Sequence, residues 1–336
     1  MTGAHSSRLV HRQARDLGFD RCGIARAEPI GRSQYLRAWL DAGRAGSMAY
    51  LHRYFEERTD PRRLLDGARS VIVVARLYHQ RPESRPAPSD GPHGRVAMYA
   101  WGDDYHDVIR ARLRELVDRL HESIAEPFEA KVCVDTVPLL ERELAAIAGI
   151  GWIGKNTLVL NERLGSYFFL GAVVTTLDLE PDEPAIDHCG TCTACLDACP
   201  TEAFTAPYQM DASRCISYLT IEHRGDISKG FQDMMGDWIF GCDVCQEVCP
   251  YNRDAPLTDE PRFAIRPVAP TIALDDIRSW SPDDYRRKLR GSAMQRAKPD
   301  MFKRNADIAA NNLSRPAPDI AESKGNQARR TDRDSV

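Results

Sequence analysis

The sequence predicts an α+β protein, and three observations support this fold class. Apolar, β-prone runs alternate with amphipathic stretches through the first 180 residues. Eight of the ten cysteines then fall between positions 189 and 249. A helical pattern follows, and after Ser314 the chain is polar and flanked by prolines. With 43% hydrophobic and 28% charged residues, the 336-residue chain has an ordinary globular composition and room for two or three domains.

The first 180 residues alternate between predicted helices and strands. Runs rich in β-branched and apolar residues predict strands at 19–25, 70–78, 129–136 and 165–179. The intervening stretches predict helices at 6–17, 35–42, 46–58, 107–125 and 139–148. Residues 80–94 are rich in proline, serine and glycine, which indicates a long exposed loop.

Asp135 is the first candidate for chemistry because it stands at the end of a predicted strand. In α/β sheets, ligands gather at the carboxyl ends of strands. An aspartate in this place is equally suited to capping the helix that follows it. Asp104 and His106 precede another predicted helix, where capping or core hydrogen bonding is the more usual role.

The segment 149–157 (GIGWIGKNT) is rich in glycine, which lets backbone approach a ligand closely. It matches neither a Walker loop nor a dinucleotide fingerprint, so we expect no nucleotide cofactor. Cys22 and Cys133 lie within predicted strands, where a small buried thiol is the ordinary expectation.

The remaining cysteines have iron–sulfur spacing. The first run, C-x2-C-x2-C-x3-C-P, consists of Cys189, Cys192, Cys195, Cys199 and Pro200. In such a run, three thiolates bind one 4Fe-4S cluster and the fourth binds a second cluster. The second run consists of Cys242, Cys245, Cys249 and Pro250; it has Ile239 where a further cysteine would stand, and Cys215 restores the count of eight.

We therefore assign the eight thiols to two 4Fe-4S clusters. The first cluster takes Cys189, Cys192, Cys195 and Cys249, and the second takes Cys199, Cys215, Cys242 and Cys245. Two four-cysteine zinc sites are the alternative, but zinc ribbons do not use the three-cysteine turn closed by Cys-Pro. Residues 1–20 hold no secretory leader, so we expect a cytoplasmic protein with reduced cysteines. No apolar run is long enough to span a bilayer.

Five segments together resemble the epoxyqueuosine reductase family, over most of residues 10–313. They are VDTVPLLERELAAIAGIGWIGKNT, GSYFFLG, CGTCTACLDACPTEAF, CISYLTIEHRG and GCDVCQEVCPYN. The resemblance implies an oxidoreductase that reduces epoxyqueuosine to queuosine at the wobble position of a tRNA anticodon. It also implies cobalamin fed by two 4Fe-4S clusters, an external low-potential electron donor, no membrane partner and a monomeric chain.

The resemblance further implies a division into regions. We expect a cobalamin-binding domain similar to reductive dehalogenases and nitroreductases at 1–180, and a ferredoxin-like domain at 181–256. A linker with a shortened, HEAT-like helical region follows at 257–313, and a disordered tail at 314–336. The shortened helical region puts in doubt any tRNA contact that longer relatives make with later repeats.

Family motifs also suggest roles for single residues. Asp135 corresponds to the acid that protonates the departing oxygen, and burial beside an apolar corrin face is expected to raise its pKa. Candidate corrinoid contacts are Arg58, Met98, Tyr99, Asp135, Thr157, Ser217, Tyr218, His223 and Asp243. Ordinary packing remains the alternative for Ser217 and Tyr218, and a surface position for His223. The D-x-H-x-x-G pattern of histidine-ligated corrinoids is not matched, so we expect base-off cobalamin.

A basic stretch is the candidate tRNA contact. Residues 286–304 hold eight basic residues and one acid, a local charge of +7 in a chain whose net charge is −4. Such a cluster can bind phosphates, although a solvated helix face is the ordinary alternative. Basic residues of the long loop could add to this contact: Arg81, Arg85, His93 and Arg95.

Two rival functions share part of this pattern. A corrinoid reductive dehalogenase would share the cofactors, but it normally carries a twin-arginine leader that residues 1–20 lack. A ferredoxin-type electron carrier would not need so long an α/β region before its cysteines.

Overall fold

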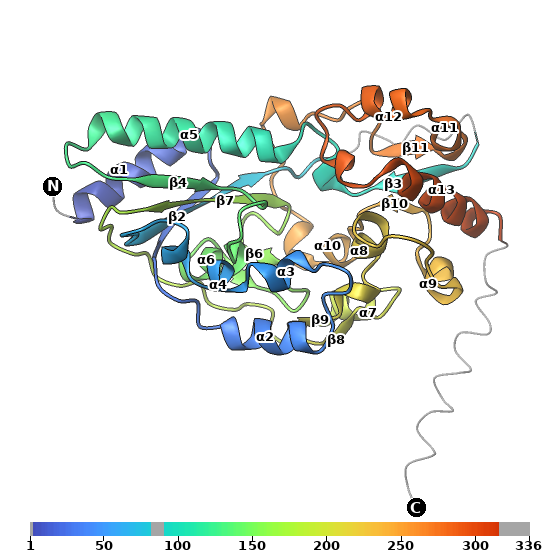
Figure 1. Cartoon of the computed structure of the whole chain (residues 1–336), viewed down its shortest axis with the longest axis horizontal. Helices are drawn as coiled ribbons and strands as arrows, with labels where there is room; N and C mark the ends of the chain where they lie inside the picture. The colour runs from blue at the N-terminus through green and yellow to red at the C-terminus, as the bar shows by residue number, and fades with distance from the viewer. Residues whose placement is uncertain (1–2, 82–90, 316–336) are drawn as a thin grey trace, which may run out of the picture.

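A four-stranded sheet forms the centre of the N-terminal half of the computed structural model, which describes residues 3–81 and 91–315 (Figure 1). Its strands, in spatial order, are β1 (Arg21–Arg26), β2 (Ser70–Leu77), β7 (Phe168–Thr175) and β4 (Ala130–Cys133). All three pairings are antiparallel. The four predicted strands are confirmed, but the sheet is not of the parallel kind. The rule about carboxyl strand ends, used above to single out Asp135, therefore does not apply.

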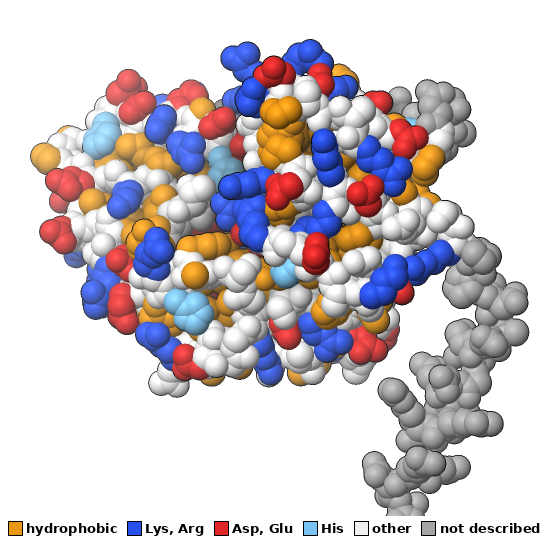
Figure 2. Space-filling view, turned by 45° about the vertical axis from the view of Figure 1, so that its right-hand side comes forward, with side chains coloured by type: hydrophobic (Ala, Val, Ile, Leu, Met, Phe, Trp, Pro, Cys, Tyr) orange, Lys and Arg blue, Asp and Glu red, His pale blue; other side chains and the backbone are white. Residues whose placement is uncertain are grey.

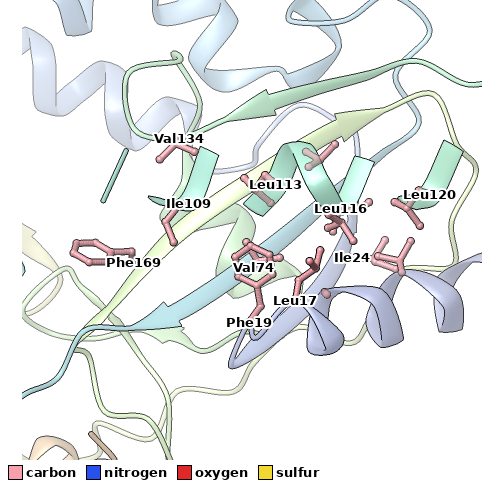
Figure 3. Close-up of a cluster of buried hydrophobic side chains, with 14 of the residues drawn as sticks. Leu17, Phe19, Ile24, Val74, Ile109, Leu113, Leu116, Leu120, Val134 and Phe169 are labelled. Atoms are coloured by element: carbon pink, nitrogen blue, oxygen red, sulfur yellow. The ribbon is translucent and has the colours of Figure 1, made fainter. Parts of the chain in front are cut away.

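Both faces of this sheet are buried, and alternate residues of β2 divide between them. Ile72 and Val74 pack into one hydrophobic cluster, whereas Val71 and Val73 pack into the other. Figure 3 shows the first cluster, with Val74 among side chains of α5 and of residues 17–24. Every residue of β2 is buried, and its apolar run from Val71 to Ala75 is typical of a central strand.

Helices cover the two faces of the sheet (Figure 1). On one face lie α1 (Gly3–Asp16) and α5 (Tyr105–Ser123), whose apolar stripes supply fully buried residues such as Val10 and Leu113. The opposite face is covered by α6 (Glu141–Ile147). Truncating a buried leucine such as Leu113 to alanine costs about 2–5 kcal/mol in cores of this kind.

The segment between β1 and β2 is helical and irregular. It contains α2 (Ser33–Asp41), α3 (Tyr50–Arg53), α4 (Phe55–Thr59) and η1 (Pro61–Arg63). The single helix predicted at 46–58 is wrong, because Tyr54 leaves helical geometry with φ −114° and ψ 38°. This break separates α3 from α4.

Short elements make up the remaining parts of the N-terminal half and the cysteine-rich half. The strands are β5 (Trp152–Ile153), β6 (Val159–Leu160), β8 (Phe204–Ala206) and β9 (Gln209–Met210). The helices are α7 (Ala194–Asp197), α8 (Ile216–Ile221), α9 (Lys229–Met234) and α10 (Val244–Glu247), with 3-10 turns η2 (Met98–Ala100), η3 (Ala212–Arg214), η4 (Pro250–Asn252) and η5 (Pro261–Phe263).

A second sheet contains one strand from each of three regions that the sequence predicts, 1–180, 181–256 and 257–313. It joins β3 (His93–Val96), β10 (Trp238–Phe240) and β11 (Thr271–Ala273). The loop predicted at 80–94 therefore ends earlier than expected, since β3 begins at His93. Residues 82–90 lie outside the described residues, and Arg85 with them.

The C-terminal helices pack on this second sheet. They are α11 (Leu274–Ser279), α12 (Pro282–Lys288), η6 (Ala293–Arg296) and α13 (Pro299–Leu313). Phe302 of α13 stacks on Phe240 of β10 with ring centroids 5.8 Å apart. The helices thus share a core with the sheet. The predicted tail lies almost wholly outside the described residues, which end at Arg315.

Ion pairs tie the segment after the cysteines to the first sheet. Arg76 of β2, 4% exposed, pairs with Asp259 at 2.5 Å, and the buried Glu260 pairs with Arg112 of α5. Within the described residues, every helix is too short or too polar to cross a membrane.

Candidate functional site

Asp135 lies in the turn after β4, and side chains from the start of α5 hold its carboxylate. The hydroxyl of Tyr105 donates to Oδ2 at 2.9 Å, and Nε2 of His106 lies 3.0 Å from the same oxygen. Asp135 has a φ of 48°, in the left-handed region that non-glycine residues seldom adopt. Such strain persists where surrounding contacts fix it, so this turn is held in place by its hydrogen bonds.

Asp104 holds the other side of the His106 ring. As the N-cap of α5, it accepts a hydrogen bond from the backbone nitrogen of His106 at 3.0 Å, which confirms the predicted capping role. The same Oδ1 lies 2.7 Å from Nδ1 of His106. Both ring nitrogens of His106 are therefore bonded to carboxylates, and the sequence did not predict the bond to Asp135.

Hydrogen bonding decides which of these groups holds the proton. Burial lowers the pKa of His106, but hydrogen bonds to Asp104 and Asp135 outweigh it and raise the pKa to about 9. Burial raises the pKa of Asp135, but hydrogen bonds from His106 and Tyr105 outweigh it, and the pKa lies below its ordinary value. The expectation of a raised pKa at Asp135 is therefore wrong, because two donors stabilise the ionised carboxylate. At neutral pH the proton resides on His106.

Glu141 fixes the backbone of Asp135. Its Oε1 accepts a hydrogen bond from the backbone nitrogen of Asp135 at 2.9 Å. Burial, and then the charge of Asp135, raise the pKa of Glu141 to about 8. Helix α6 has Leu140 at its N-cap without a side-chain cap, so the alternative role of Asp135 as a helix cap is excluded. Glu141 is a positioning residue that the sequence analysis missed, although it lies in the quoted VDTVPLLERE motif.

Two arginines contribute charge near Asp135. Arg58 of α4 lies within electrostatic reach of Asp135 and Glu141, and burial lowers its pKa. Its Nε is buried and has no hydrogen-bond partner among the described residues. Arg296, predicted as part of a basic surface, instead forms a two-bond pair with Glu222 at 2.9 and 3.1 Å. Its charge also lowers the pKa of Asp135, so this arginine belongs to the same site.

Three of the predicted corrinoid contacts lie together. Asp243 is 4% exposed, and its Oδ2 accepts a hydrogen bond from the backbone nitrogen of Met98 at 2.6 Å. Burial raises the pKa of Asp243 to about 6. The ring of Tyr99 lies 6.3 Å from that of Tyr105 and packs against three hydrophobic clusters. Met98, Tyr99 and Asp243 therefore form a link between the start of α5 and the cysteine-rich half.

Thr157 resembles Asp135 in its backbone. Its φ is 64°, and Nη1 of Arg142 donates to its carbonyl oxygen at 2.6 Å. Arg142 lies on α6, one residue after Glu141. Helix α6 thus anchors the left-handed backbone at Asp135 and at Thr157.

The last three predicted contacts have other partners. The hydroxyl of Tyr218 accepts a hydrogen bond from the backbone nitrogen of Ser47 at 2.7 Å, and Nε2 of His223 lies 2.9 Å from the carbonyl oxygen of Asp226. Within the described residues, no hydrogen bond joins Ser217, Tyr218 or His223 to Asp135.

The cysteines gather in the two sets that their spacing suggested. Cys189, Cys192, Cys195 and Cys249 line one cavity. In the second set, Cys242 lies within electrostatic reach of Cys199 and Cys215, and Cys245 within reach of Cys215 and Cys242. Nowhere in residues 3–81 and 91–315 do three His, Cys, Asp or Glu side chains have the arrangement of a site for one metal ion.

The two sets differ chiefly at one cysteine. Cys192 is the exposed thiol among the eight, whereas burial raises the pKa of Cys195 and Cys249 in its own set and of Cys242 and Cys245 in the other. A buried thiol binds metal as a thiolate, so the charge of iron is needed to hold these cysteines ionised. Ile239, at the position where a ninth cysteine would complete the repeat, is fully buried in β10. Eight cysteines in two sets fit two four-thiolate sites.

The fold and the cysteine segment define an α+β protein with an iron–sulfur binding region. A family model described as "4Fe-4S double cluster binding domain" matches residues 188–252, and one described as "Epoxyqueuosine reductase QueG, DUF1730" matches residues 58–136. The chain belongs to the epoxyqueuosine reductase family, as its relatives at about 40% identity make plain.

Relatives and solved structures match nearly the whole chain. The epoxyqueuosine reductase of Cellulophaga algicola is 41% identical over 303 residues, covering 90% of this chain and 97% of the relative. That of Pseudomonas aeruginosa is 41% identical over 308 residues, covering 90% and 84%. The structure from Streptococcus thermophilus has a TM-score of 0.83 at 32% identity, covering 91% and 81%. An epoxyqueuosine reductase solved with an epoxyqueuosine-modified tRNA-Tyr stem loop has a TM-score of 0.83 at 30% identity, with the same coverage.

Proposed function

We propose that this chain reduces epoxyqueuosine to queuosine at the wobble position of tRNA anticodons. The observation that supports this proposal most directly is that a hydrogen-bonded carboxyl group at Asp135 and two sets of four thiols occur in one chain of this family. A family member has been solved with an epoxyqueuosine-modified stem loop, which supports the same substrate here. The ferredoxin-type carrier and the reductive dehalogenase are not favoured by the relatives that match.

Electrons enter, in this proposal, through the cluster held by Cys189, Cys192, Cys195 and Cys249. The exposure of Cys192 supports this order, because an external low-potential donor has to approach within transfer distance. The cluster held by Cys199, Cys215, Cys242 and Cys245 comes next. Asp243 stands between Cys242 and Cys245 and bonds Met98, so this set lies toward the acid site.

The residues around Asp135 fit a corrinoid. Arg58 has a buried Nε without a partner among the described residues, and the left-handed backbone of Asp135 and Thr157 is typical of a ligand-holding turn. Arg58, Asp135 and Thr157 would hold base-off cobalamin, which would supply low-valent cobalt for reduction of the epoxide carbon. His106 has both ring nitrogens bonded to carboxylates, which supports the absence of a ligating histidine.

Asp135 and His106 together hold and move the proton. Opening an epoxide to an alkene takes two electrons and two protons and releases water, so the departing oxygen needs an acid. His106 carries the proton in the open site and shares it with Oδ2 of Asp135 over 3.0 Å. When substrate excludes water, a neutral pair becomes more favourable than an ion pair, and the proton passes to Asp135. Asp135 then donates it to the oxygen, and the second proton needed to release water is taken up from solvent by His106 and passed along the same path. Tyr105 and Asp104 act as positioning residues.

Exposed lysines and arginines near the C-terminus supply the tRNA contact. The local charge is smaller than the sequence suggested, because Arg286 and Arg287 pair with Asp283 and Asp284 and Arg296 pairs with Glu222. Arg290, Lys298 and Lys303 are exposed and form no ion pair with any described residue. Figure 2 shows Lys and Arg side chains gathered beside a hollow on this face.

Residues of the predicted long loop contribute less than expected. Arg95 pairs with Asp237 at 2.7 Å and stacks over Trp238, so its guanidinium is engaged within the protein. His93 is part of β3.

Anaerobic reconstitution tests the proposal. The chain is loaded with iron and sulfide, with and without cobalamin, and given a chemical reductant and an anticodon stem loop bearing epoxyqueuosine. We expect iron–sulfur absorption in both samples and queuosine only with cobalamin. Zinc in place of iron, or epoxide reduction that does not depend on cobalamin, would overturn it.

A further inference from the structure

The segment 149–157 has no role in the function proposed so far, yet it meets the cysteines. We propose that Trp152, Lys155 and Asn156 are hydrogen-bonding residues that raise the reduction potential of the surface cluster, held by Cys189, Cys192, Cys195 and Cys249. The inference rests on the proposed assignment of that cluster and assigns to the N-terminal half a part in tuning it.

Lys155 and Asn156 line the same cavity as the four thiols. They come from the hairpin of β5 and β6, more than thirty residues before the first of these cysteines. A cluster in this cavity would therefore touch two parts of the chain, the cysteine turn on one side and the hairpin on the other.

Asn156 has a donor that nothing in the described protein uses. The side chain is 3% exposed, and its Oδ1 accepts a hydrogen bond from the backbone nitrogen of Leu158 at 3.2 Å. That bond fixes which end of the amide is oxygen and leaves Nδ2 buried, without a partner among the described residues. Buried donors are almost always paired, so an unpaired one beside four thiols points to a sulfur acceptor.

Two further donors act on the same cysteine turn. Nε1 of Trp152 lies 3.4 Å from Sγ of Cys189 and donates to it. Nζ of Lys155, which is 8% exposed, donates to the carbonyl oxygens of Gly190 at 2.7 Å and Cys192 at 2.9 Å. An indole, an amide and an ammonium group thus face one thiol set.

The backbone of the hairpin brings these donors close. A Cβ at Gly151 would lie 2.1 Å from the backbone oxygen of Leu160, so only glycine fits there. Thr157, with its φ of 64°, closes the turn. The tight packing of this hairpin therefore brings its donors close to the cluster site.

Donors of this kind change the potential in a known direction. One-electron reduction adds negative charge to the cluster, and N–H groups and a cation next to the sulfurs stabilise the reduced form more than the oxidised form. Loss of a donor should therefore make the surface cluster harder to reduce. The potential of the second cluster, held by Cys199, Cys215, Cys242 and Cys245, should not change.

The test is an electron paramagnetic resonance redox titration of the reconstituted full chain. Asn156→Leu and Trp152→Phe each remove one donor; the first keeps the branched shape of the side chain and the second keeps an aromatic ring. We expect the midpoint of one cluster signal to move to more negative potential in each variant, and further in the double variant. The signal lost in Cys192→Ser identifies the surface cluster. Trp280→Phe is the matched control. It removes a buried indole N–H that, like Nδ2 of Asn156, has no partner among the described residues, but this indole lies in another core.

The outcomes separate this inference from the proposed function. Unchanged midpoints at full iron content, or equal shifts of both clusters, would overturn the inference and leave the function standing. A parent protein that holds no iron would overturn the function itself. If Asn156→Leu loses iron because the cavity distorts, the midpoint of Trp152→Phe decides.

Discussion

The region of the thiols and the region around Asp135 differ in how their polar groups are held. Cys215 and Cys242 are packed among apolar residues such as Met235 and Trp238. The carboxylate of Asp135 is 59% exposed, with His106 beside it at 20%. Apolar packing fixes the first region, whereas hydrogen bonds and a strained turn fix the second.

This difference matches what the two regions would have to do. Electron transfer gains from sites that do not move, and burial gives them that rigidity. A proton donor has to meet a substrate that arrives from solvent, so it has to stay accessible until the substrate covers it. We therefore expect substitutions among the thiols to change iron content, and substitutions around Asp135 to change turnover while iron is retained.

The largest effect is expected from removing cysteines. Cys249→Ala and Cys199→Ala should each lose about half of the iron, because each removes a ligand of a different cluster. Turnover should be abolished in both. The measurement is iron content and visible absorption after anaerobic reconstitution, with Cys22→Ala as the control that keeps full iron.

Double variants sharpen the pairing. Cys192→Ala combined with Cys249→Ala should lose no more iron than either alone, since both serve the surface cluster. Cys199→Ala combined with Cys249→Ala should lose nearly all of it. Nearly complete loss of iron in the Cys192→Ala and Cys249→Ala double variant would mean that Cys249 does not serve the cluster of Cys189, Cys192 and Cys195.

The thiol region could be predicted in detail from the sequence, whereas the region around Asp135 could not. Seven of the eight cysteines recur at gaps of two and three residues, so their spacing indicates a ligand role, whereas Cys215 was assigned only by completing the count. The contact of Tyr105 with Asp135 joins residues 30 positions apart and depends on the antiparallel order of the first sheet. No local pattern encodes that order.

The second sheet illustrates the same limit. Its strands β3, β10 and β11 have three or four residues each, too few to show a periodicity. Of the helices packed on it, α13 was predicted because its apolar stripe repeats over several turns, whereas the six-residue α11 was not predicted. Arg296 was assigned to a basic surface because its partner, Glu222, lies 74 residues away.

The next largest effect is expected at Asp135. Asp135→Asn preserves the shape of the side chain but cannot relay a proton, so turnover should fall by about 10²–10⁴-fold. Iron and cobalamin content should be unchanged. Single-turnover rates on a modified stem loop measure this, with Asp118→Asn on the exposed face of α5 as control. A rate near that of the parent would remove Asp135 from the chemistry.

A smaller effect, and one that depends on pH, is expected at His106. Turnover should decline as pH rises through about 9, where His106 loses the proton that it shares with Asp135. His106→Gln should be slower by about 10-fold and should lack this alkaline decline. The rate of the parent and the variant between pH 6 and 10 tests this, with the exposed His5→Gln as control. An unaltered alkaline decline in His106→Gln would assign it to another group.

The same shift predicts a change in folding stability. The folded pKa of His106 is raised above the model-peptide value of about 6.5, so its stabilising contribution is complete below that pH. The contribution is lost as pH rises through about 9. The free energy of unfolding should therefore fall over this range in the parent and change less in His106→Gln.

The smallest effect is expected on the basic surface, which extends the contrast from proton and electron transfer to substrate binding. Arg290→Gln, Lys298→Gln and Lys303→Gln together should weaken binding of an anticodon stem loop and flatten its dependence on salt, because each lost phosphate contact lowers the slope of log K against log salt by about 0.7–0.9. Arg8, Arg12 and Arg15 on α1, changed together to glutamine, form the matched control, since α1 and α13 lie at opposite ends of the molecule (Figure 1). Equal slopes in both triple variants would mean that the tRNA is held elsewhere. Iron content and the rate at saturating stem loop should remain those of the parent, because these three side chains bind the substrate backbone and take no part in moving electrons or protons.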